Sequence, residues 1–359
     1  MKAVLMLEDG LQFSGEAVGR PGESIGELIL NTAVVGYQEM MTDPANAGKI
    51  LVLTYPLIGN YGINKKFNES SKCWLSGLVV KEKSRIYSNW QAKSSFEDFV
   101  KAQGLLVIND IDTRTLTVHL RDKGEMLGII STKTTDAKEL LPKIREFQRN
   151  QNKDFLSIIS LKKPALIGNK KARYKLAILD LGLTHSIIKQ LETLGCCLHI
   201  FPYNTGPKEI FKTKPAGLII SNGPENDVGL EVVVNNVKYF IGKMPILGIS
   251  TGHQVLAAAL GAKINKMKLG HRGVNYPVAQ ARGSYKDKIT VQNHSYVVDN
   301  DSLSRIKDIK ITGYNLNDHT VEEMESRKLK LMGIQYYPTS PGFNEVNEVL
   351  KKFTQLLKN

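Results

Sequence analysis

The stretch from Pro245 to Gly261 constrains the fold of this chain more than any other part of the sequence. It reads as an apolar strand, a turn with glycines at 248 and 252, and a helix that ends at a glycine. Ser250 lies between the two glycines, and a residue so placed at a strand-to-helix turn is held in a sharp bend with its side chain exposed. The first amides of the helix could stabilise an oxyanion beside it. The stretch predicts a nucleophile elbow suited to acyl transfer, while a glycine-rich turn that only packs remains the alternative.

Apolar strands alternate with amphipathic helices on both sides of this turn. Strands are predicted at 175–179, 197–201, 217–220 and 245–249, with helices at 186–194 and after Gly229. This alternation is typical of a doubly wound, mainly parallel α/β sheet with helices on both faces. The elbow then lies at the carboxyl end of a strand, where such folds place their sites. The last third reads as strand-rich before a closing helix at 344–357.

The first part of the chain has a different pattern. Short apolar runs separated by Gly, Pro, Asn and Asp turns predict a strand-rich α+β domain. Polar stretches at 36–39, 42–44, 54–62 and 112–114 show neither metal-ligand spacing nor a nucleophile beside a base, so physical reasoning alone assigns them to loops. A charged helix is predicted at 137–150. The predicted division is a first domain at 1–132, a helical and basic linker at 133–172, and a second domain at 173–359.

Composition excludes several classes of protein. The net charge of +13 comes from lysines spread along the chain without interleaved aromatic residues, which favours a solvated basic surface over a nucleic-acid site. A run of about 18 apolar residues is missing, and an acidic pair at 8–9 follows the N-terminus, so neither a membrane span nor a signal peptide is predicted. The cysteines at 73, 196 and 197 fit neither a disulfide framework nor a zinc site, and a cytoplasmic protein is expected.

Motifs beyond the elbow point to a family. Residues 221–224, 247–254, 270–273 and 292–294 read SNGP, LGISTGHQ, GHRG and QNH, and the first part carries further stretches at 7–10, 36–39, 42–44, 53–56, 58–60, 111–114 and 120–124. With these stretches the chain resembles the small subunit of carbamoyl-phosphate synthase over nearly its whole length. The first-domain stretches distinguish it from other class I glutamine amidotransferases. The resemblance implies a subunit that hydrolyses glutamine and passes ammonia to a large synthetase subunit.

The same resemblance sets the expected partners and cofactors. The large subunit would make carbamoyl phosphate from bicarbonate with ATP and magnesium, so neither a cofactor nor a metal is expected in this chain. The expected partners are that large subunit and, as a small ligand, glutamine or another amino acid. Nucleic acid and membranes are not expected. Whether the product serves arginine or pyrimidine biosynthesis stays open.

Three positions that carry the family's chemistry are replaced here. The family has cysteine at the elbow and a distal His-Pro-Glu that supplies the base and its orienting residue. This chain has Ser250 at the elbow and Tyr337 in place of the histidine, and Thr339 falls where the glutamate belongs, unless that acid is deleted from a run one residue short. A serine hydroxyl depends on its base far more than a thiol does, and a phenol is a poor proton acceptor at pH 7. The resemblance therefore predicts that glutaminase activity is absent or residual.

The glutamine pocket that the resemblance implies is altered as well. Replaced positions are Ala45 for a serine, Glu225 for a glycine, Ser295 for a glycine, and Thr251 for a leucine whose backbone amide belongs to the oxyanion hole; retained positions are Gly223, Gln254, Asn293 and Tyr296. We therefore expect a structural or regulatory subunit of a synthetase that takes free ammonia.

Other hypotheses rest on the same residues. A slow glutaminase or a serine hydrolase would use Ser250 with a histidine as base, the candidates being His253, His271, His294 and His319. Tyr337 could bridge to Ser250 by a hydrogen bond or fill an apolar gap. Glu225 could hold a cationic ligand in an amino-acid sensor, or it could be a solvated loop carboxylate.

Overall fold

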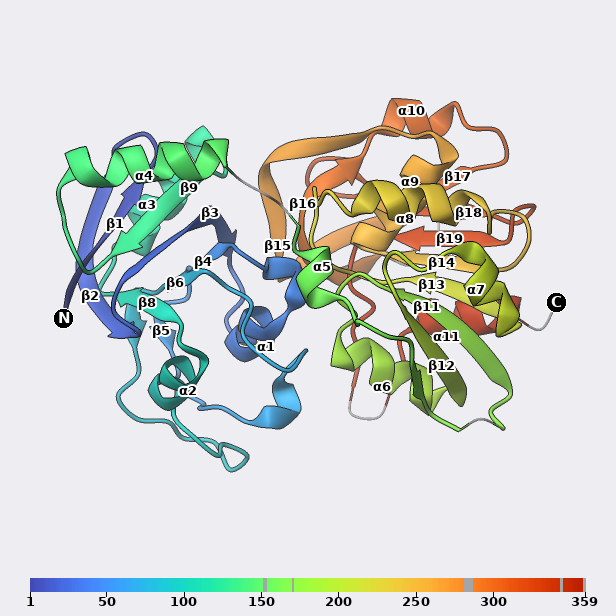
Figure 1. Cartoon of the computed structure of the whole chain (residues 1–359), viewed down its shortest axis with the longest axis horizontal. Helices are drawn as coiled ribbons and strands as arrows, with labels where there is room; N and C mark the ends of the chain where they lie inside the picture. Colours follow the sequence, from blue (N-terminus) through green and yellow to red (C-terminus); the bar gives the residue numbers. More distant parts are fainter. Residues whose placement is uncertain (151–153, 170, 281–286, 343–344, 358–359) are drawn as a thin grey trace. The chain divides into compact units, whose positions relative to one another are not determined.

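The computed structural model describes residues 1–150, 154–169, 171–280, 287–342 and 345–357, and the chain divides into two compact units (Figure 1). The first comprises Met1–Asn152 with Lys268–Arg272, and the second Lys153–Met267 with Gly273–Asn359. The division at 152–153 lies inside the segment predicted as a linker. Residues 268–272 group with the first unit because the Glu125 amide donates to the Lys268 carbonyl at 2.9 Å and the Glu125 carboxylate pairs with buried Arg272.

A closed β-barrel forms the core of the first unit. In order around the barrel its strands are β1 (Lys2–Leu7), β2 (Gln12–Gly19), β8 (Leu106–Asn109), β6 (Gly77–Val79), β4 (Ile50–Leu53), β3 (Glu23–Asn31) and β9 (Leu127–Ser131). Because the barrel is closed, each of these strands pairs with a neighbour on both sides, and the barrel has no edge with unpaired backbone groups. Helices α2 (Phe96–Gln103) and α4 (Ala137–Arg149) pack against it, and β5 (Leu57–Ile58) with β7 (Glu82–Lys83) forms a small separate sheet. The strand-rich α+β prediction is confirmed.

Two stretches predicted as loops begin α-helices instead. The stretch at 36–39 opens α1 (Tyr37–Thr42) after Gly36, whose φ of 93° suits glycine. The stretch at 112–114 opens α3 (Thr113–Lys123), where the Asp112 carboxylate caps the helix by accepting from the Thr115 amide at 3.0 Å. The loop prediction was wrong because α1 is too short, and α3 too polar, to show the apolar period by which helices are identified.

The polar residues of α1 hold a neighbouring loop of the first unit. The Gln38 side chain donates to the Asn64 carbonyl at 2.6 Å and accepts from the Asn64 amide at 3.0 Å. The Tyr37 hydroxyl donates to the Gly62 carbonyl at 2.7 Å, and its ring stacks on Tyr61 with centroids 4.2 Å apart. These buried polar groups satisfy one another, which is a structural role. Two short 3-10 helices, η1 (Pro44–Asn46) and η2 (Lys65–Phe67), lie in the same region of the sequence.

A long mixed sheet forms the second unit (Figure 1). Its strand order is β10 (Ala165–Ile167), β12 (Cys196–Pro202), β11 (Tyr174–Asp180), β13 (Gly217–Ile220), β14 (Ile246–Ile249), β19 (Leu331–Ile334), β18 (Val321–Ser326), β17 (Lys310–Asn315), β15 (Ile264–Gln280) and β16 (Lys288–Val298). The strands from β12 to β19 in this order run parallel, and β18 and β17 are antiparallel to their neighbours.

Helices cover both faces of the parallel part of this sheet. One apolar layer includes residues of α8 (Leu230–Lys238) and α9 (Thr251–Leu260), and the other includes residues of α6 (His185–Thr193) and α11 (Glu348–Leu356). The remaining helices are α5 (Leu156–Ile159), α7 (Pro207–Lys212) and α10 (Asn300–Ser304). The doubly wound α/β prediction is confirmed. The closing helix begins at Glu348, later than predicted, because Asn347 caps it by accepting from the Val349 amide at 2.9 Å; residues 343–344 lie outside the described ranges.

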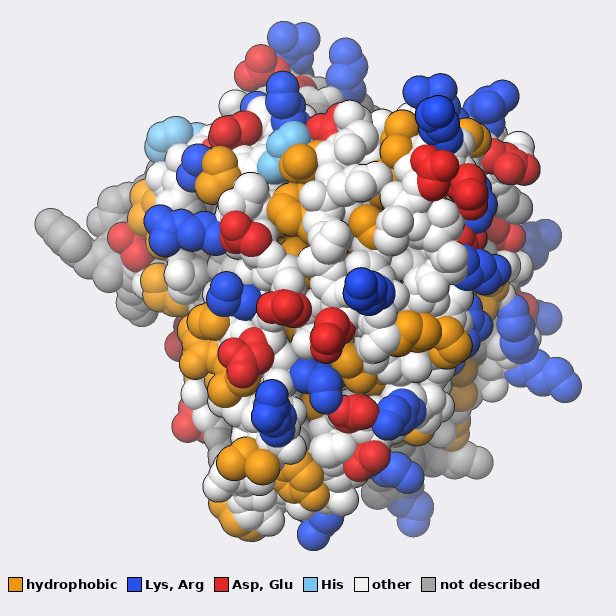
Figure 2. Space-filling model, turned by 90° about the vertical axis from the view of Figure 1, so that its left-hand side faces the viewer, with side chains coloured by type: hydrophobic (Ala, Val, Ile, Leu, Met, Phe, Trp, Pro, Cys, Tyr) orange, Lys and Arg blue, Asp and Glu red, His pale blue; other side chains and the backbone are white. Residues whose placement is uncertain are grey.

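The face of the molecule drawn in Figure 2 carries charges of both signs. On the face drawn in Figure 2, lysine and arginine side chains are interspersed with aspartate and glutamate, and hydrophobic side chains form small groups among them. A nucleic-acid backbone is bound by clustered basic residues, so this face does not favour that partner. None of the helices in the described ranges combines the length and the apolar character needed to cross a bilayer.

Candidate active site

The turn at Ser250 has the strained geometry that its flanking glycines predict. Strand β14 ends at Ile249 and α9 begins at Thr251, and Ser250 between them has φ 53° and ψ −112°, which residues other than glycine rarely adopt. Its amide donates to the Ile334 carbonyl at the end of β19 at 2.8 Å, and its carbonyl accepts from the His253 amide at 2.9 Å. The ends of β14 and β19 and the first turn of α9 therefore hold the elbow together.

Both glycines are required by close backbone packing. A Cβ at Gly252 would lie 2.0 Å from the Ile220 carbonyl oxygen of β13, and one at Gly248 would lie 2.5 Å from the Gly252 carbonyl oxygen. These neighbours are backbone atoms, which cannot move aside as a flexible side chain can. Substituting either glycine would force apart the strand and helix that form the elbow.

Gly252→Ala is expected to lower the free energy of unfolding by about 3 kcal/mol because of this overlap. Chemical denaturation followed by circular dichroism measures the loss. The matched control is Gly206→Ala, because a Cβ at Gly206 would have no atom of the described residues within 4 Å. This variant should lower the free energy of unfolding by less than about 1 kcal/mol. Equal losses in the two variants would contradict this account of the elbow.

No general base forms a hydrogen bond with the Ser250 hydroxyl in the described part of the chain. The residue is only 1% exposed, and its hydroxyl has no hydrogen-bond partner in the described part of the chain. The side-chain Nδ2 of Asn222 lies 3.5 Å from the Tyr337 hydroxyl, at the outer limit of a hydrogen bond. The proposed bridge between Tyr337 and Ser250 is therefore not formed.

Tyr337 and Thr339 occupy the distal run without forming a base and its orienting residue. The Tyr337 amide donates to the Val291 carbonyl at 2.9 Å, and the Thr339 amide donates to the Tyr337 carbonyl at 2.8 Å. Thr339 is exposed, and its carbonyl accepts from the Asn347 side chain at 2.9 Å. These backbone hydrogen bonds shape the chain after β19.

His253 is buried in the core of the second unit. It is 0% exposed, and its ring lies against β19, where a Cβ built on Gly333 would be 2.3 Å from Nδ1. Neither ring nitrogen has a hydrogen-bond partner among the described residues, and burial lowers the pKa of His253 to about 3. The ring is therefore neutral and packed on the sheet, and it makes no hydrogen bond to the Ser250 hydroxyl.

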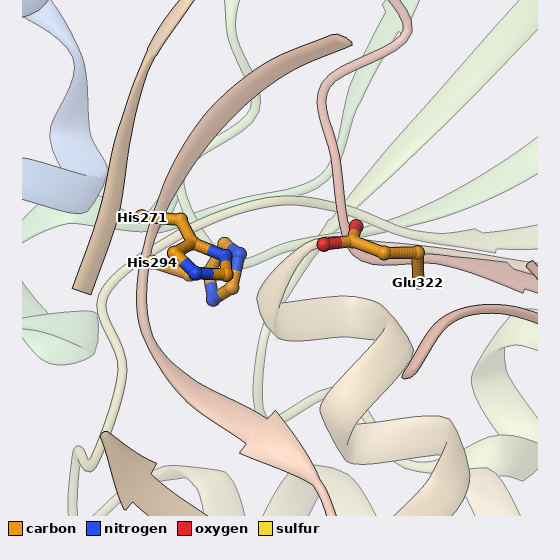
Figure 3. Close-up of side chains that lie close together, drawn as sticks. All are labelled: His271, His294 and Glu322. Carbon is orange, nitrogen blue, oxygen red and sulfur yellow. The ribbon is translucent and has the colours of Figure 1, made fainter. Parts of the chain in front are cut away.

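The other candidate histidines also fail to provide a base. Figure 3 draws His294 on β16 and Glu322 on β18, together with His271, which is a residue of β15. His294 Nδ1 lies 3.0 Å from the Tyr296 carbonyl. His319 is exposed in the loop between β17 and β18. None of them reaches the Ser250 hydroxyl, given the absence of any partner for it in the described ranges.

His294 and Glu322 are close enough to raise the question of a metal. Their ligand atoms lie within 4.8 Å of one another, and both residues belong to the second unit. The two Glu322 oxygens, however, already accept from the side-chain amides of Gln292 at 2.8 Å and Asn315 at 3.0 Å. A metal ion at Glu322 would have to displace these two donors.

The loop that follows β13 lies directly against the elbow. A Cβ at Gly223 would be 1.9 Å from the Leu181 carbonyl oxygen, so this position admits only glycine. The Thr251 hydroxyl donates to the Gly223 carbonyl at 2.6 Å, which ties the loop to the first residue of α9. The threonine side chain, absent from the family pattern, thus supports the loop.

Glu225 has a role that the sequence did not indicate. Its carboxylate accepts from the Gln254 side chain at 2.7 Å and from the amides of Ser295 and Tyr296 at 2.6 and 3.1 Å. The interpretation as a solvated loop carboxylate is wrong, because the carboxylate is held by donors of its own chain, while the site for a cation stays a prediction. No local pattern could have revealed this, since the donors lie 29, 70 and 71 residues away.

The remaining predicted pocket residues divide between the two units. Asn293 lies on β16 and is half-buried, and Ser295 on the same strand is buried. Ala45 belongs to the first unit, where it is buried in η1 and its amide donates to the Asp43 carboxylate at 2.9 Å. The second unit thus brings together Ser250, Thr251, Gln254, Gly223, Glu225 and Tyr296 through the contacts described above.

A strained elbow between a parallel strand and a helix, in a doubly wound sheet, is typical of α/β enzymes that carry a nucleophile at such a turn. The class-I glutamine amidotransferase model matches residues 177–356, and the model of the CPSase domain of the carbamoyl-phosphate synthase small chain matches residues 5–130. The chain belongs to the carbamoyl-phosphate synthase small-chain family.

Relatives named carbamoyl phosphate synthase small chain match over the full length. The chain is 37% identical to that of Syntrophotalea carbinolica, covering 100% of this chain and 98% of the relative. It is 38% identical to that of Listeria monocytogenes, covering 99% and 97%. The chloroplastic small chain of Oryza sativa is 34% identical, covering 99% of this chain and 82% of the relative. The family suggested by the sequence motifs is therefore confirmed.

Proposed function

We propose that this chain is the small subunit of a carbamoyl-phosphate synthase that draws on free ammonia, and that it has lost the glutaminase chemistry of its family. The observation that carries the proposal is the buried Ser250 hydroxyl, which has no hydrogen-bond partner in the described part of the chain. A serine nucleophile needs a general base within hydrogen-bond reach. The phenol at position 337 is a donor at neutral pH and would not accept the proton.

The proposed role is structural or regulatory, within a complex with a large subunit. Relatives that match over nearly their whole length are named small chains, which supports a large-subunit partner. The intact barrel of the first unit, matched by the small-chain model over residues 5–130, supports the same assignment. ATP and magnesium would act on the large subunit, and this chain would contribute neither. We place the complex in the cytoplasm and leave the arginine or pyrimidine pathway open.

The test is reconstitution with the large subunit from the same cell. We expect the two chains to co-elute in size-exclusion chromatography and to make carbamoyl phosphate from ammonia, but not from glutamine. The matched control replaces this chain by a family small subunit with cysteine at the elbow, which should support synthesis from glutamine. A chain that stays alone at physiological concentration would overturn the partner assignment, and synthesis from glutamine would overturn the proposed loss of chemistry.

A further inference from the structure

The donors around Glu225 form a receptor for a carboxylate. Oε1 accepts from the Gln254 side chain and the Tyr296 amide, and Oε2 accepts from the Ser295 amide, at 2.7, 3.1 and 2.6 Å. Two successive backbone amides with a side-chain amide are a recurring arrangement for holding a free carboxylate. The helix that provides Gln254 begins at the elbow, so its N-terminal dipole adds to the attraction for negative charge.

The donors lie on a helix and a strand, whereas the Glu225 carboxylate that they hold lies on a loop. Ser295 and Tyr296 lie on β16 and Gln254 in the first turns of α9, all within ordered elements of the sheet and its covering helix. Glu225 lies instead on the loop between β13 and α8, two residues after Gly223. The tight contact of Gly223 with Leu181 and the bond from Thr251 anchor that loop, so the carboxylate is aimed at the donors.

A cavity adjoins these donors. It has a volume of about 240 Å³ and is lined by Gln254 and Tyr296 together with apolar residues that include Leu230, Val234, Val255 and Ala258. Gln254 and Tyr296, which hold the Glu225 carboxylate, thus also line this cavity. This volume is smaller than the usual volume of a pocket for a drug-sized ligand, so the cavity suits a smaller organic molecule.

We infer that Glu225 occupies, from within the chain, a subsite for the α-carboxylate of a free amino acid, and thereby keeps the donors Gln254, Ser295 and Tyr296 closed to that ligand. The inference deepens the proposed function and rests on it, since it takes the elbow pocket to be a former amino-acid site. Two carboxylates cannot share one set of donors without unpaired like charges, so an amino acid binds there only when the Glu225 side chain is removed.

The test is glutamine binding to the full chain, measured by isothermal titration calorimetry. The native chain is expected to show no saturable binding up to millimolar glutamine, whereas Glu225→Ala is expected to bind at least about tenfold more tightly than any native signal. Glutaminol, in which a hydroxymethyl group replaces the carboxylate, should not bind to Glu225→Ala. The matched control is Glu231→Ala, which removes an exposed carboxylate of the nearby helix α8 and should behave like the native chain.

Equal affinity of native and Glu225→Ala chains for glutamine would overturn the inference, as would a folded Glu225→Ala chain that binds nothing. If the alanine variant unfolds, Glu225→Gly is titrated in its place with the same two outcomes. Ammonia is measured in the same samples: its release by the native chain would count against the proposed loss of chemistry, whereas the binding comparison tests the occupied subsite alone.

Discussion

The purified chain is expected to release ammonia from glutamine on the order of 10⁶-fold more slowly than a family small subunit that retains cysteine and histidine at the elbow and base positions. The reason is that Ser250 lacks a base in contact, while Tyr337 and His253 cannot take its place. A coupled glutamate dehydrogenase assay measures the rate, with and without the large subunit. A serine-directed covalent probe should likewise leave the chain unlabelled.

Variants at Ser250, Tyr337 and Glu225 test why the chain is expected to lack glutaminase activity. Ser250→Cys, and Ser250→Cys with Tyr337→His, are expected to remain inactive, because the Glu225 carboxylate still occupies the donors beside the elbow. Adding Glu225→Ala to the double variant is expected to give the first measurable ammonia release. Activity of the native chain, or probe labelling that Ser250→Ala abolishes, would show that the elbow serine has a working base after all.

The second large effect is a dependence of stability on pH that arises from His253. Burial lowers the pKa of its imidazole from 6.5 to about 3 in the folded chain. Below pH 6.5 the imidazole of His253 therefore binds a proton in the unfolded chain but not in the folded chain. The free energy of unfolding consequently falls as pH falls. The slope approaches about 1.4 kcal/mol per pH unit, and the full loss is on the order of 4 kcal/mol once pH nears 3.

Urea unfolding between about pH 4.5 and pH 6.5 measures this contribution. His253→Met should be less steep than the native chain over that range, because the variant has no imidazole to protonate. The matched control is His319→Gln, which removes an exposed histidine and should keep the native slope. Identical slopes for the native chain and His253→Met would show that the buried ring does not remain neutral.

The elements with strong periodic patterns were predictable from the sequence. The run at 217–220 coincides with β13, and the charged helix at 137–150 is α4 to within one residue. Patterns failed where local capping, and not an apolar stripe, defines a helix, as at Asp112. The long strand β15 also escaped prediction. Two lysines and two glycines interrupt its alternation, and its pairing with neighbouring strands specifies it instead.

The candidate site shows the same limit. The glycines at 248 and 252 could be identified along the chain, because a strained turn is a property of residue types and their order. The altered triad positions were identified through the resemblance to the family, since a phenol at the base position is a poor proton acceptor. The role of Glu225 could not be identified in either way, because its donors come from a helix and a strand far along the sequence. Residue identity thus establishes which reaction is chemically possible, whereas packing between distant segments establishes which ligand can enter, since only the folded chain brings those donors to one carboxylate.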